Sequence, residues 1–300
     1  MSPAAVRSAD SPKISVVVIS HNEGRNLAWT VESLHETLPP DREILVVDDR
    51  SSDGSTDCLK TANSGARVVC PRRRLGVAAA RNWGAARARG TYIIFVDAHN
   101  TFPPGWQRPL TELLENPAIG AVAPAISDRN VRDRKGFGLR LIGPDLEVEW
   151  LDRQGDRPHS VPLLPGGCLA MRRDTFEAVG GFDEGLIRYG VEDSELSLRL
   201  WLLGYELWMV PGVEVAHVFR EQIPYRVHWR TVLHNRLRMA LLHLNARRLV
   251  RVVDALQRYR EFASALALVM DSDVSVRRAD LRARRVLDDD WFFQKFNLKW

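Results

Sequence analysis

Two continuous runs of apolar, mostly β-branched residues stand near the start of the chain, at residues 14–20 and 43–48. Such runs are typical of strands that are covered on both faces, as in the centre of a parallel sheet. Between them, leucine and valine recur at helical spacing, which predicts a helix over residues 25–37. The pattern therefore indicates a βαβ unit.

The same alternation continues through the first half of the chain. Further strands are expected at residues 66–70, 92–97 and 120–126, and further helices at residues 76–88 and 104–115. Regular alternation of this kind predicts an α/β protein with a doubly wound sheet, in which ligands bind at the carboxyl ends of the strands. Functional side chains are therefore expected directly after Ser20, Val47 and Val96.

The second half of the chain has a different pattern. Residues 127–165 are richer in Asp, Arg, Gly and Pro, which favours loops or a β-ribbon that acts as a lid or an acceptor-binding region. After Glu192, leucines at helical spacing predict a helix that ends at Gly204, and residues 205–210 resume as a strand. From Arg226 onward the sequence is mostly helical.

Composition limits the class of protein. The 300 residues are 45% hydrophobic and 27% charged, which is typical of a globular chain with one large domain or two modest ones. The net charge of +4 suits phosphate-bearing ligands. The arginine-rich stretch at residues 277–285 lacks interleaved aromatic residues and has acidic neighbours, so no nucleic-acid partner is expected.

The cysteines and the start of the chain bear on the compartment. Cys58, Cys70 and Cys168 are odd in number and lack metal-binding spacing, which indicates neither a disulfide framework nor a structural zinc site. Residues 1–13 lack the apolar core of a signal peptide, and no later run approaches the roughly 18 apolar residues that span a bilayer. These features predict a cytoplasmic protein without a transmembrane anchor.

A carboxylate and an imidazole follow the strand expected at residues 92–97. Asp97 and His99 are two residues apart and point the same way in an extended segment, so they could bind one divalent ion. A solvated loop is the simpler alternative, but the position after a buried strand favours a metal. His217 also follows a strand and could complete the site, or it could be a core histidine. A metal with few protein ligands keeps positions free for a diphosphate.

Polar side chains also follow the first two strands. Ser20, His21 and Glu23 come at the end of the first strand, and Asp48 and Asp49 at the end of the second. The Asp48 carboxylate could accept hydrogen bonds from a uracil imide or from ribose hydroxyls, although turn and capping chemistry is the alternative. We expect these residues to line one nucleotide-binding crevice.

A cation and two carboxylates complete the candidate site. Arg81 lies in an alanine-rich helical segment, and its guanidinium group could bind a diphosphate. Glu192 and Asp193 precede a predicted helix, where they could cap its free amides or act as a general base. The small residues Gly166 and Gly167 would admit a substrate.

In their order along the chain, these motifs resemble the catalytic domain of nucleotide-sugar glycosyltransferases of the GT-A type, specifically glycosyltransferase family 2. The motifs are SVVVISHNE, VVDDRSSDGS, GVAAARNWGA, FVDAH, GGCLAMRR, GGFDE and VEDSELSLRLW. The resemblance implies a Rossmann-like mixed sheet flanked by helices. It divides the chain into a flexible N-terminus at residues 1–12, a catalytic domain at 13–245 and a C-terminal helical extension at 246–300.

Three details resemble the polypeptide N-acetylgalactosaminyltransferases in particular. They are the SHNE motif, the DAH strand end in place of Asp-x-Asp, and the HVFR segment followed by Pro224 and Tyr225. By this resemblance, Mn²⁺ or Mg²⁺ would be bound by Asp97, His99 and His217. The residues expected to contact the nucleotide sugar are Asp48, at the nucleoside, and Arg81 and Arg220, at the diphosphate or the sugar.

The reaction implied by the resemblance is transfer of a hexosyl or N-acetylhexosaminyl group from a nucleoside diphosphate sugar, with a UDP-sugar favoured. The acceptor could be a peptide, a glycan or a small molecule. Where the N-acetylgalactosaminyltransferases have Glu-Asn, this chain has Glu192-Asp193, as inverting family 2 members do. Asp193 would then be the base for in-line attack. If the enzyme instead retains configuration, Asp193 has a binding role.

Two other functions share parts of this pattern. A sugar nucleotidyltransferase normally has a Gly-rich phosphate loop after the first strand, where this chain has His21 to Gly24. A non-catalytic nucleotide-sugar-binding protein would not need a base, metal ligands and cations together. The aromatic residues at 291–300 could pack on the domain, bind an acceptor or form a contact, so a homodimer through the C-terminal helices is also considered.

Overall fold

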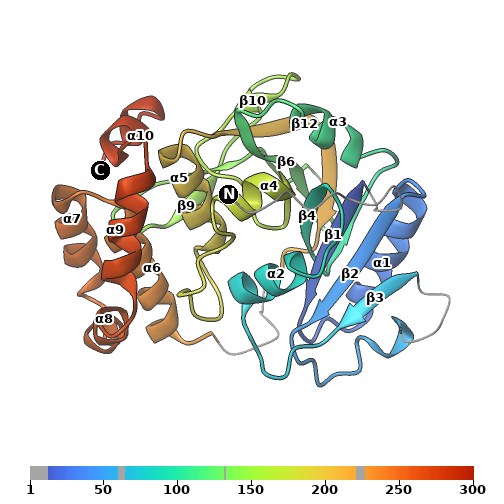
Figure 1. Ribbon diagram of the computed structural model, residues 1–300, viewed down its shortest axis with the longest axis horizontal. Coiled ribbons are helices and arrows are strands. Elements are labelled where there is room, and N and C mark those ends of the chain that lie inside the picture. Colours follow the sequence, from blue (N-terminus) through green and yellow to red (C-terminus); the bar gives the residue numbers. More distant parts are fainter. Residues whose placement is uncertain (1–12, 60–64, 132, 221–226) are drawn as a thin grey trace, which may run out of the picture.

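The computed structural model describes residues 13–59, 65–131, 133–220 and 227–300, and its centre is one large mixed sheet (Figure 1). The strand order is β10-β12-β6-β11-β4-β1-β2-β3. These strands are β1 (Ile14–Ser20), β2 (Arg42–Asp48), β3 (Ala66–Val69), β4 (Tyr92–Asp97), β6 (Ile119–Asp128), β10 (His159–Ser160), β11 (Cys168–Arg172) and β12 (Glu206–His217). The predicted terminus at residues 1–12, and Pro224 and Tyr225, lie outside the described residues.

The parallel half of the sheet follows the predicted pattern. β1 pairs in parallel with β2 and β4, and β2 pairs in parallel with β3. Val16 and Val18 point into one apolar cluster and Val17 into the other, so the consecutive valines are explained by a strand that is covered on both faces. The expected strands and helices of this half are confirmed.

The two helices beside this half cover opposite faces of the sheet. The apolar stripe of α1 (Arg25–Thr37) packs into one cluster, and the alanines of α2 (Val77–Ala85) pack into the other. α2 lies close to the strands, since a Cβ at Gly84 would come within 2.5 Å of Val17 Cγ1. Small residues at this contact explain the alanine- and glycine-rich composition of α2. α3 (Gln107–Leu113) is shorter than the helix expected there.

The sheet is mixed because β11 runs antiparallel between β4 and β6. The alternation pattern indicated a doubly wound sheet and did not identify this strand, which is followed by the short helix α4 (Arg173–Ala178). A five-residue buried strand has the same apolar composition in either direction, so its orientation depends on distant partners. The mixed sheet implied by the family resemblance is confirmed.

β12 is twice as long as the strand expected at residues 205–210. It continues through Pro211 and Gly212, where its register with β6 shifts between Val210 and Glu214. Pro and Gly here belong to a β-bulge and do not end the strand. The bulge lets β12 extend along β6 to His217, which pairs with the short strand β5 (Asn100–Thr101).

Residues 127–165 form the expected excursion. β7 (Lys135–Gly136) extends the main sheet, and β8 (Leu139–Leu141) pairs antiparallel with β9 (Val148–Trp150) as a separate ribbon. The ribbon places Trp150 against Phe219, with 5.9 Å between the ring centroids.

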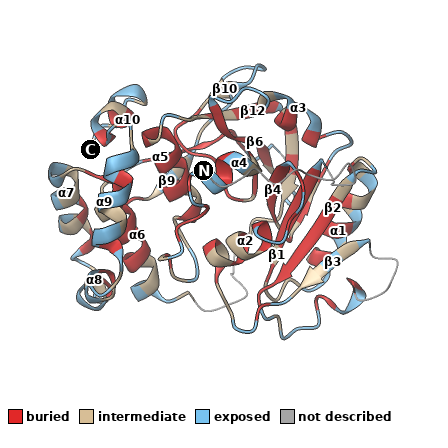
Figure 2. Ribbon diagram, viewed as in Figure 1, coloured by how far each residue is buried: buried red, intermediate tan, exposed pale blue. Residues whose placement is uncertain are grey.

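Apart from β12, the chain from Glu192 onward is mostly helical, and its helices share the buried core with the sheet (Figure 2). Its helices are α5 (Glu192–Leu202), α6 (Trp229–His243), α7 (Ala246–Leu256), α8 (Phe262–Met270), α9 (Val274–Arg284) and α10 (Asp289–Lys295). α8 and α9 pack on α6, and α10 packs on α5. One buried cluster extends from Phe95 in the sheet to Phe292 near the C-terminus. Within the residues described, none of the helices combines the length and apolar character needed to cross a membrane.

Candidate functional site

A cavity of about 410 Å³ lies at the carboxyl ends of β1 and β4, between the start of α5 and the end of β12. It is lined by all but one of the residues predicted for the site: Ser20, His21, Glu23, Asp49, Arg81, Asp97, His99, Gly166, Gly167, Glu192, Asp193, His217 and Arg220. The exception is Asp48, whose buried carboxylate accepts the Ser51 amide at 2.8 Å. Its expected contact with the nucleoside stays a prediction.

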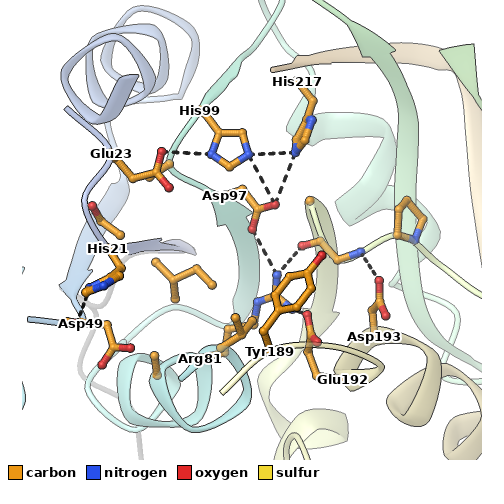
Figure 3. Close-up of a pocket in the computed structure, with 18 of the residues that line it drawn as sticks. His21, Glu23, Asp49, Arg81, Asp97, His99, Tyr189, Glu192, Asp193 and His217 are labelled. Atoms are coloured by element: carbon orange, nitrogen blue, oxygen red, sulfur yellow. Dashed lines mark hydrogen bonds and ion pairs between the residues drawn. The ribbon is translucent and has the colours of Figure 1, made fainter. Parts of the chain in front are cut away.

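Asp97, His99 and His217 converge on one side of the cavity (Figure 3). Their ligand atoms lie within 4.8 Å of one another, with 3.0 Å between the two Nε2 atoms and 3.5 Å from His217 Nε2 to Asp97 Oδ2. One carboxylate oxygen and two imidazole nitrogens form a donor set that suits Mn²⁺ and other divalent transition metals. The two histidines come from separate parts of the chain, and the pairing of β5 with β12 brings them together.

The pKa of Asp97 reflects this setting. Burial acts to raise it, but the His217 hydrogen bond, the charge of Arg81 and the imidazole of His99 outweigh burial and hold the pKa below its usual range. The group is therefore a carboxylate at neutral pH and available as a ligand.

Glu23 contacts His99 on the side away from this cluster. Its Oε2 lies 3.2 Å from His99 Nδ1 and also pairs with Arg220. A carboxylate at Nδ1 favours the tautomer that leaves Nε2 free to bind a metal, as outer-sphere carboxylates do in many metal sites. Figure 3 shows His99 linked to Glu23 through one ring nitrogen and to Asp97 and His217 through the other.

Arg81 links the metal-binding candidates to the acidic start of α5. Its Nη2 lies 3.2 Å from Asp97 Oδ1, and its Nη1 lies 3.2 Å from Glu192 Oε1. The same Nη2 donates to the Gly166 carbonyl at 2.7 Å. The side chain is only 2% exposed, so the guanidinium group is held in one orientation beside the cavity.

Glu192 and Asp193 differ in their surroundings. Burial and the Asp193 charge raise the pKa of Glu192 to about 7, and Arg81 offsets them only in part. Asp193 is anchored by the backbone, since Oδ2 accepts the Gly166 amide at 3.0 Å and Oδ1 accepts the Ser194 amide at 2.7 Å. Capping is thus one of its roles, and both carboxylates still line the cavity.

The glycine pair lies where side chains would occupy the site. A Cβ at Gly167 would lie 3.3 Å from His217 Cδ2 and 3.6 Å from Asp97 Oδ2. A Cβ at Gly166 would lie 3.0 Å from an Arg81 guanidinium nitrogen. Glycine therefore keeps the space beside the metal ligands and Arg81 free.

The side of the cavity next to β2 is held largely by contacts with the backbone. Asp49 accepts the amides of Leu75 and Gly76 at 2.6 and 2.9 Å, which fixes the loop before α2. His21 Nδ1 lies 2.9 Å from the Asp49 carbonyl. For these two residues the structural role is evident, and their contact with a nucleotide stays a prediction.

Several lining residues were not identified from the sequence. They are Leu139, Trp150, Arg188, Tyr189 and Phe219. Trp150 stands in a polar excursion and Tyr189 lies two residues before the VED motif, but neither position follows a pattern that distinguishes it from other exposed aromatics. Trp150, Tyr189 and Phe219 add aromatic side chains to the lining of the cavity.

The chain belongs to glycosyltransferase family 2. The model described as glycosyl transferase family 2 matches residues 15–180, more than half of the chain. A second model, described as the N-terminal domain of galactosyltransferase, matches residues 155–222. The family resemblance of the motifs is thereby confirmed.

The relatives and solved structures agree with this assignment. Human polypeptide N-acetylgalactosaminyltransferase 15 is 31% identical over 258 residues, which are 76% of this chain and 39% of the relative. Rat polypeptide N-acetylgalactosaminyltransferase 13 is 29% identical over 308 aligned residues, 94% of this chain and 54% of the relative. The chain thus spans about half or less of the length of the curated relatives it matches.

Two solved structures share the fold. GalNAc-T7 with UDP, GalNAc and Mn²⁺ matches with a TM-score of 0.77 and 22% identity, over 97% of this chain and 57% of that one. The mannosyltransferase PcManGT of Pyrobaculum calidifontis, with GDP-Man and Mn²⁺, has a TM-score of 0.55 and 19% identity, over 94% and 77% of the two chains. The predicted GT-A fold is confirmed.

Proposed function

We propose that this chain transfers a hexosyl or N-acetylhexosaminyl group from a UDP-sugar to an acceptor hydroxyl, with Mn²⁺ or Mg²⁺ bound by Asp97, His99 and His217. The observation that carries the proposal is the convergence of these three ligand groups within 4.8 Å, at the edge of the sheet and beside Arg81. Relatives named N-acetylgalactosaminyltransferases favour UDP-N-acetylgalactosamine as the donor to test first.

The charges of the site suit departure of a nucleoside diphosphate. When bound, the metal supplies positive charge that stabilises the leaving diphosphate. Arg81 and Arg220 add guanidinium groups that can bind phosphate oxygens, and both are already oriented by carboxylates. Glu23 keeps His99 Nε2 directed at the ligand cluster.

Asp193 is proposed as the base that accepts the proton of the attacking hydroxyl. The amides of Gly166 and Ser194 hold its carboxylate in a fixed position on the cavity wall. Glu192, which contacts Arg81, would keep that guanidinium group in place. A single in-line displacement with Asp193 as base inverts the anomeric centre.

The class of acceptor, the domain boundary, the oligomeric state and the location are proposed in less detail. An acceptor that reaches the site would contact the aromatic side chains of Trp150, Tyr189 and Phe219. A peptide, a glycan and a small molecule all remain candidates. The domain boundary at residue 245, the homodimer through the C-terminal helices and the cytoplasmic location stay predictions.

Release of UDP from UDP-N-acetylgalactosamine tests the proposed function. With Mn²⁺ and water as the acceptor, the native protein should release UDP slowly, and a chelator should stop the release. Asp97→Ala and His99→Ala should lower the rate at least about a hundredfold, because each removes a metal ligand. His159→Ala, at a histidine on β10 outside the cavity, should leave the rate unchanged. Equal rates in all four proteins, or in chelator, would contradict the proposal.

A further inference from the structure

Residues 187–191, which we call the strap, form a strained connection that leads into α5. Arg188 and Val191 have positive φ values near 61°, and Gly190 has a φ of 101°. The left-handed region is costly for a side chain with a Cβ, most of all for a β-branched valine. Such strain persists only where the surrounding structure holds the backbone in place, and it concentrates at functional sites.

Asn235 on α6 holds the strap from one side. Its side chain is 1% exposed, and its Oδ1 accepts the Ile187 amide at 2.8 Å. Its Nδ2 lies 3.0 Å from the carbonyl oxygen of Ile187 and 3.1 Å from those of Tyr189 and Gly190. Both ends of this one amide group therefore bond the strap backbone.

The start of α2 holds the strap from the other side. Val77 donates its amide to the Arg188 carbonyl at 2.7 Å. A Cβ at Gly76 would lie 2.5 Å from Arg188 Cα, so the two backbones are in direct contact. The strap is therefore fixed between α2 and α6.

The strap determines where the acidic groups of the site lie. Val191 is the N-cap of α5, and the next two residues are Glu192 and Asp193. The Gly190 amide also donates to Glu192 Oε2 at 3.2 Å. A shift of the strap would therefore move both carboxylates relative to Arg81 and the metal ligands.

We propose that Asn235 is a positioning residue for the transfer reaction: it braces the strap so that Glu192 and Asp193 keep their productive position. The inference rests on the proposed function. Asn235 lines no part of the cavity and acts only through the strap. The other buried polar contacts of α6 go to residues outside the strap, since Arg236 pairs with Glu147, Arg238 with Asp183 and His243 with Glu195. Leu233 and Leu237 pack in the apolar core, so the brace is distinct from the packing of the helix.

The amide group is specifically required by this arrangement. Alanine at position 235 would leave the strap carbonyls without their buried donor. Aspartate is nearly the same size but would direct a carboxylate at three carbonyl oxygens. Asn235→Asp should therefore loosen the strap more than Asn235→Ala does, which is the reverse of the order that side-chain volume predicts.

Hydrogen exchange and kinetics together test the brace. In Asn235→Ala, amides of residues 186–193 should exchange at least about tenfold faster than in the native protein, while those of β1 and β4 stay protected. The kcat for UDP release should fall by about ten- to a hundredfold, with the donor KM and the Mn²⁺ affinity changed less than about twofold. Asn235→Asp should have a larger effect on both exchange and kcat.

Leu237→Ala is the matched control on the same helix. This buried leucine should lower the melting temperature through a cavity, yet leave strap exchange and kcat near the native values below that temperature. Unchanged exchange in Asn235→Ala, or a kcat loss in Leu237→Ala as large as that in Asn235→Ala, would overturn the proposal. Faster exchange with a native kcat would also overturn it. Failure of the native protein to release UDP would instead refute the proposed function.

Discussion

Two clusters of ionisable side chains, one fully buried and one partly exposed in the cavity, differ in how their polar atoms are satisfied. In the interior cluster of Glu195, Arg199 and His243, the arginine donates to both glutamate oxygens at 2.9 Å and the histidine lies 2.8 Å from one of them. In the cavity, His99 and His217 direct their Nε2 atoms at each other, 3.0 Å apart, beside Asp97.

The comparison distinguishes a structural cluster from a binding one. Arg199 also donates to the carbonyls of Val179 and Gly181 at 2.6 Å, so its hydrogen-bonding capacity is met within the protein. The two imidazole nitrogens of the cavity have only one nearby carboxylate oxygen between them, an arrangement that a divalent cation would complete. Similar residue types thus stabilise the fold in one place and are available for a ligand in the other.

Two glutamates on this one helix show the same contrast in their pKa values. Burial raises the pKa of Glu195, but the charges and hydrogen bonds of Arg199 and His243 outweigh burial and hold it well below its usual range. Burial and the charge of the neighbouring Asp193 raise the pKa of Glu192 to about 7, and the charge of Arg81, which also pairs with Asp97, offsets them only in part. The partners, and not burial alone, decide the sign of the shift.

The largest expected effect is on catalysis at Asp193. Asp193→Asn should lower transfer or UDP release by about a thousandfold, since general base catalysis contributes about a hundred- to ten-thousandfold. The amide oxygen can still accept the Gly166 amide, so folding should be retained. His159→Ala, outside the cavity, is the control and should keep near-native turnover. Proton NMR of the product anomer gives the second test, because a retained configuration would contradict the role of Asp193 as base.

The next effect is on stability, at the interior cluster. Glu195→Gln should lower the free energy of unfolding by about 3–5 kcal/mol, because Arg199 would stay buried without its counter-charge. Denaturant unfolding measures the change, and Mn²⁺ binding to the folded fraction should be native. Glu112→Gln, which breaks an exposed pair with Arg108, should leave the unfolding midpoint in place. A loss of Mn²⁺ affinity in Glu195→Gln would refute the separation of the two clusters.

Glu192 gives a smaller effect that depends on pH. Its pKa is about 7 in the folded protein and 4.5 in the reference state, so the folded protein holds this proton more tightly. Its contribution to stability is full below about pH 4.5 and is lost as the pH rises through 7. From pH 4 to pH 8 the native protein should lose up to about 3 kcal/mol relative to Glu192→Gln. Parallel stability curves for the two proteins would contradict the raised pKa.

The smallest effect is on the orientation of His99. Glu23→Gln should weaken Mn²⁺ binding by about tenfold, because the outer carboxylate that fixes the imidazole tautomer becomes a neutral amide. Titration calorimetry with Mn²⁺ alone measures this change in affinity. Glu23 also pairs with Arg220, so Arg220→Ala is the control: it removes this pair and the 3.4 Å contact of Arg220 with His99 Nδ1, but keeps the Glu23 carboxylate beside the imidazole. An equal loss of Mn²⁺ affinity in Glu23→Gln and Arg220→Ala would show that the effect comes from the loss of the Arg220 pair and not from the His99 tautomer.

The sequence was sufficient for features that depend on local pattern. β1, α1, β2 and β4 have a continuous apolar run or a helical period, and the polar residues at their ends were predicted to meet because parallel strands share one edge. The convergence of Asp97, His99 and His217 agrees with that expectation.

Features that depend on residues far apart in the chain could not be predicted from the sequence. The direction of β11 depends on pairing with β4 and β6, and the length of β12 depends on a bulge against β6. Residues 233–240 of α6 are all buried, and Asn235 is one of several polar residues among them, so no periodic pattern distinguishes it. Asp48 follows a strand like the other predicted residues, but its carboxylate turns to the Ser51 amide.

Calorimetric titration of Mn²⁺ into the native protein and into His217→Ala, each with UDP present, tests the central claim most directly. The account predicts saturable binding to the native protein and affinity at least about tenfold weaker in the variant, because an imidazole ligand is lost. Equal Mn²⁺ affinity in the two proteins, with both folded, would contradict the metal site on which the proposed function depends.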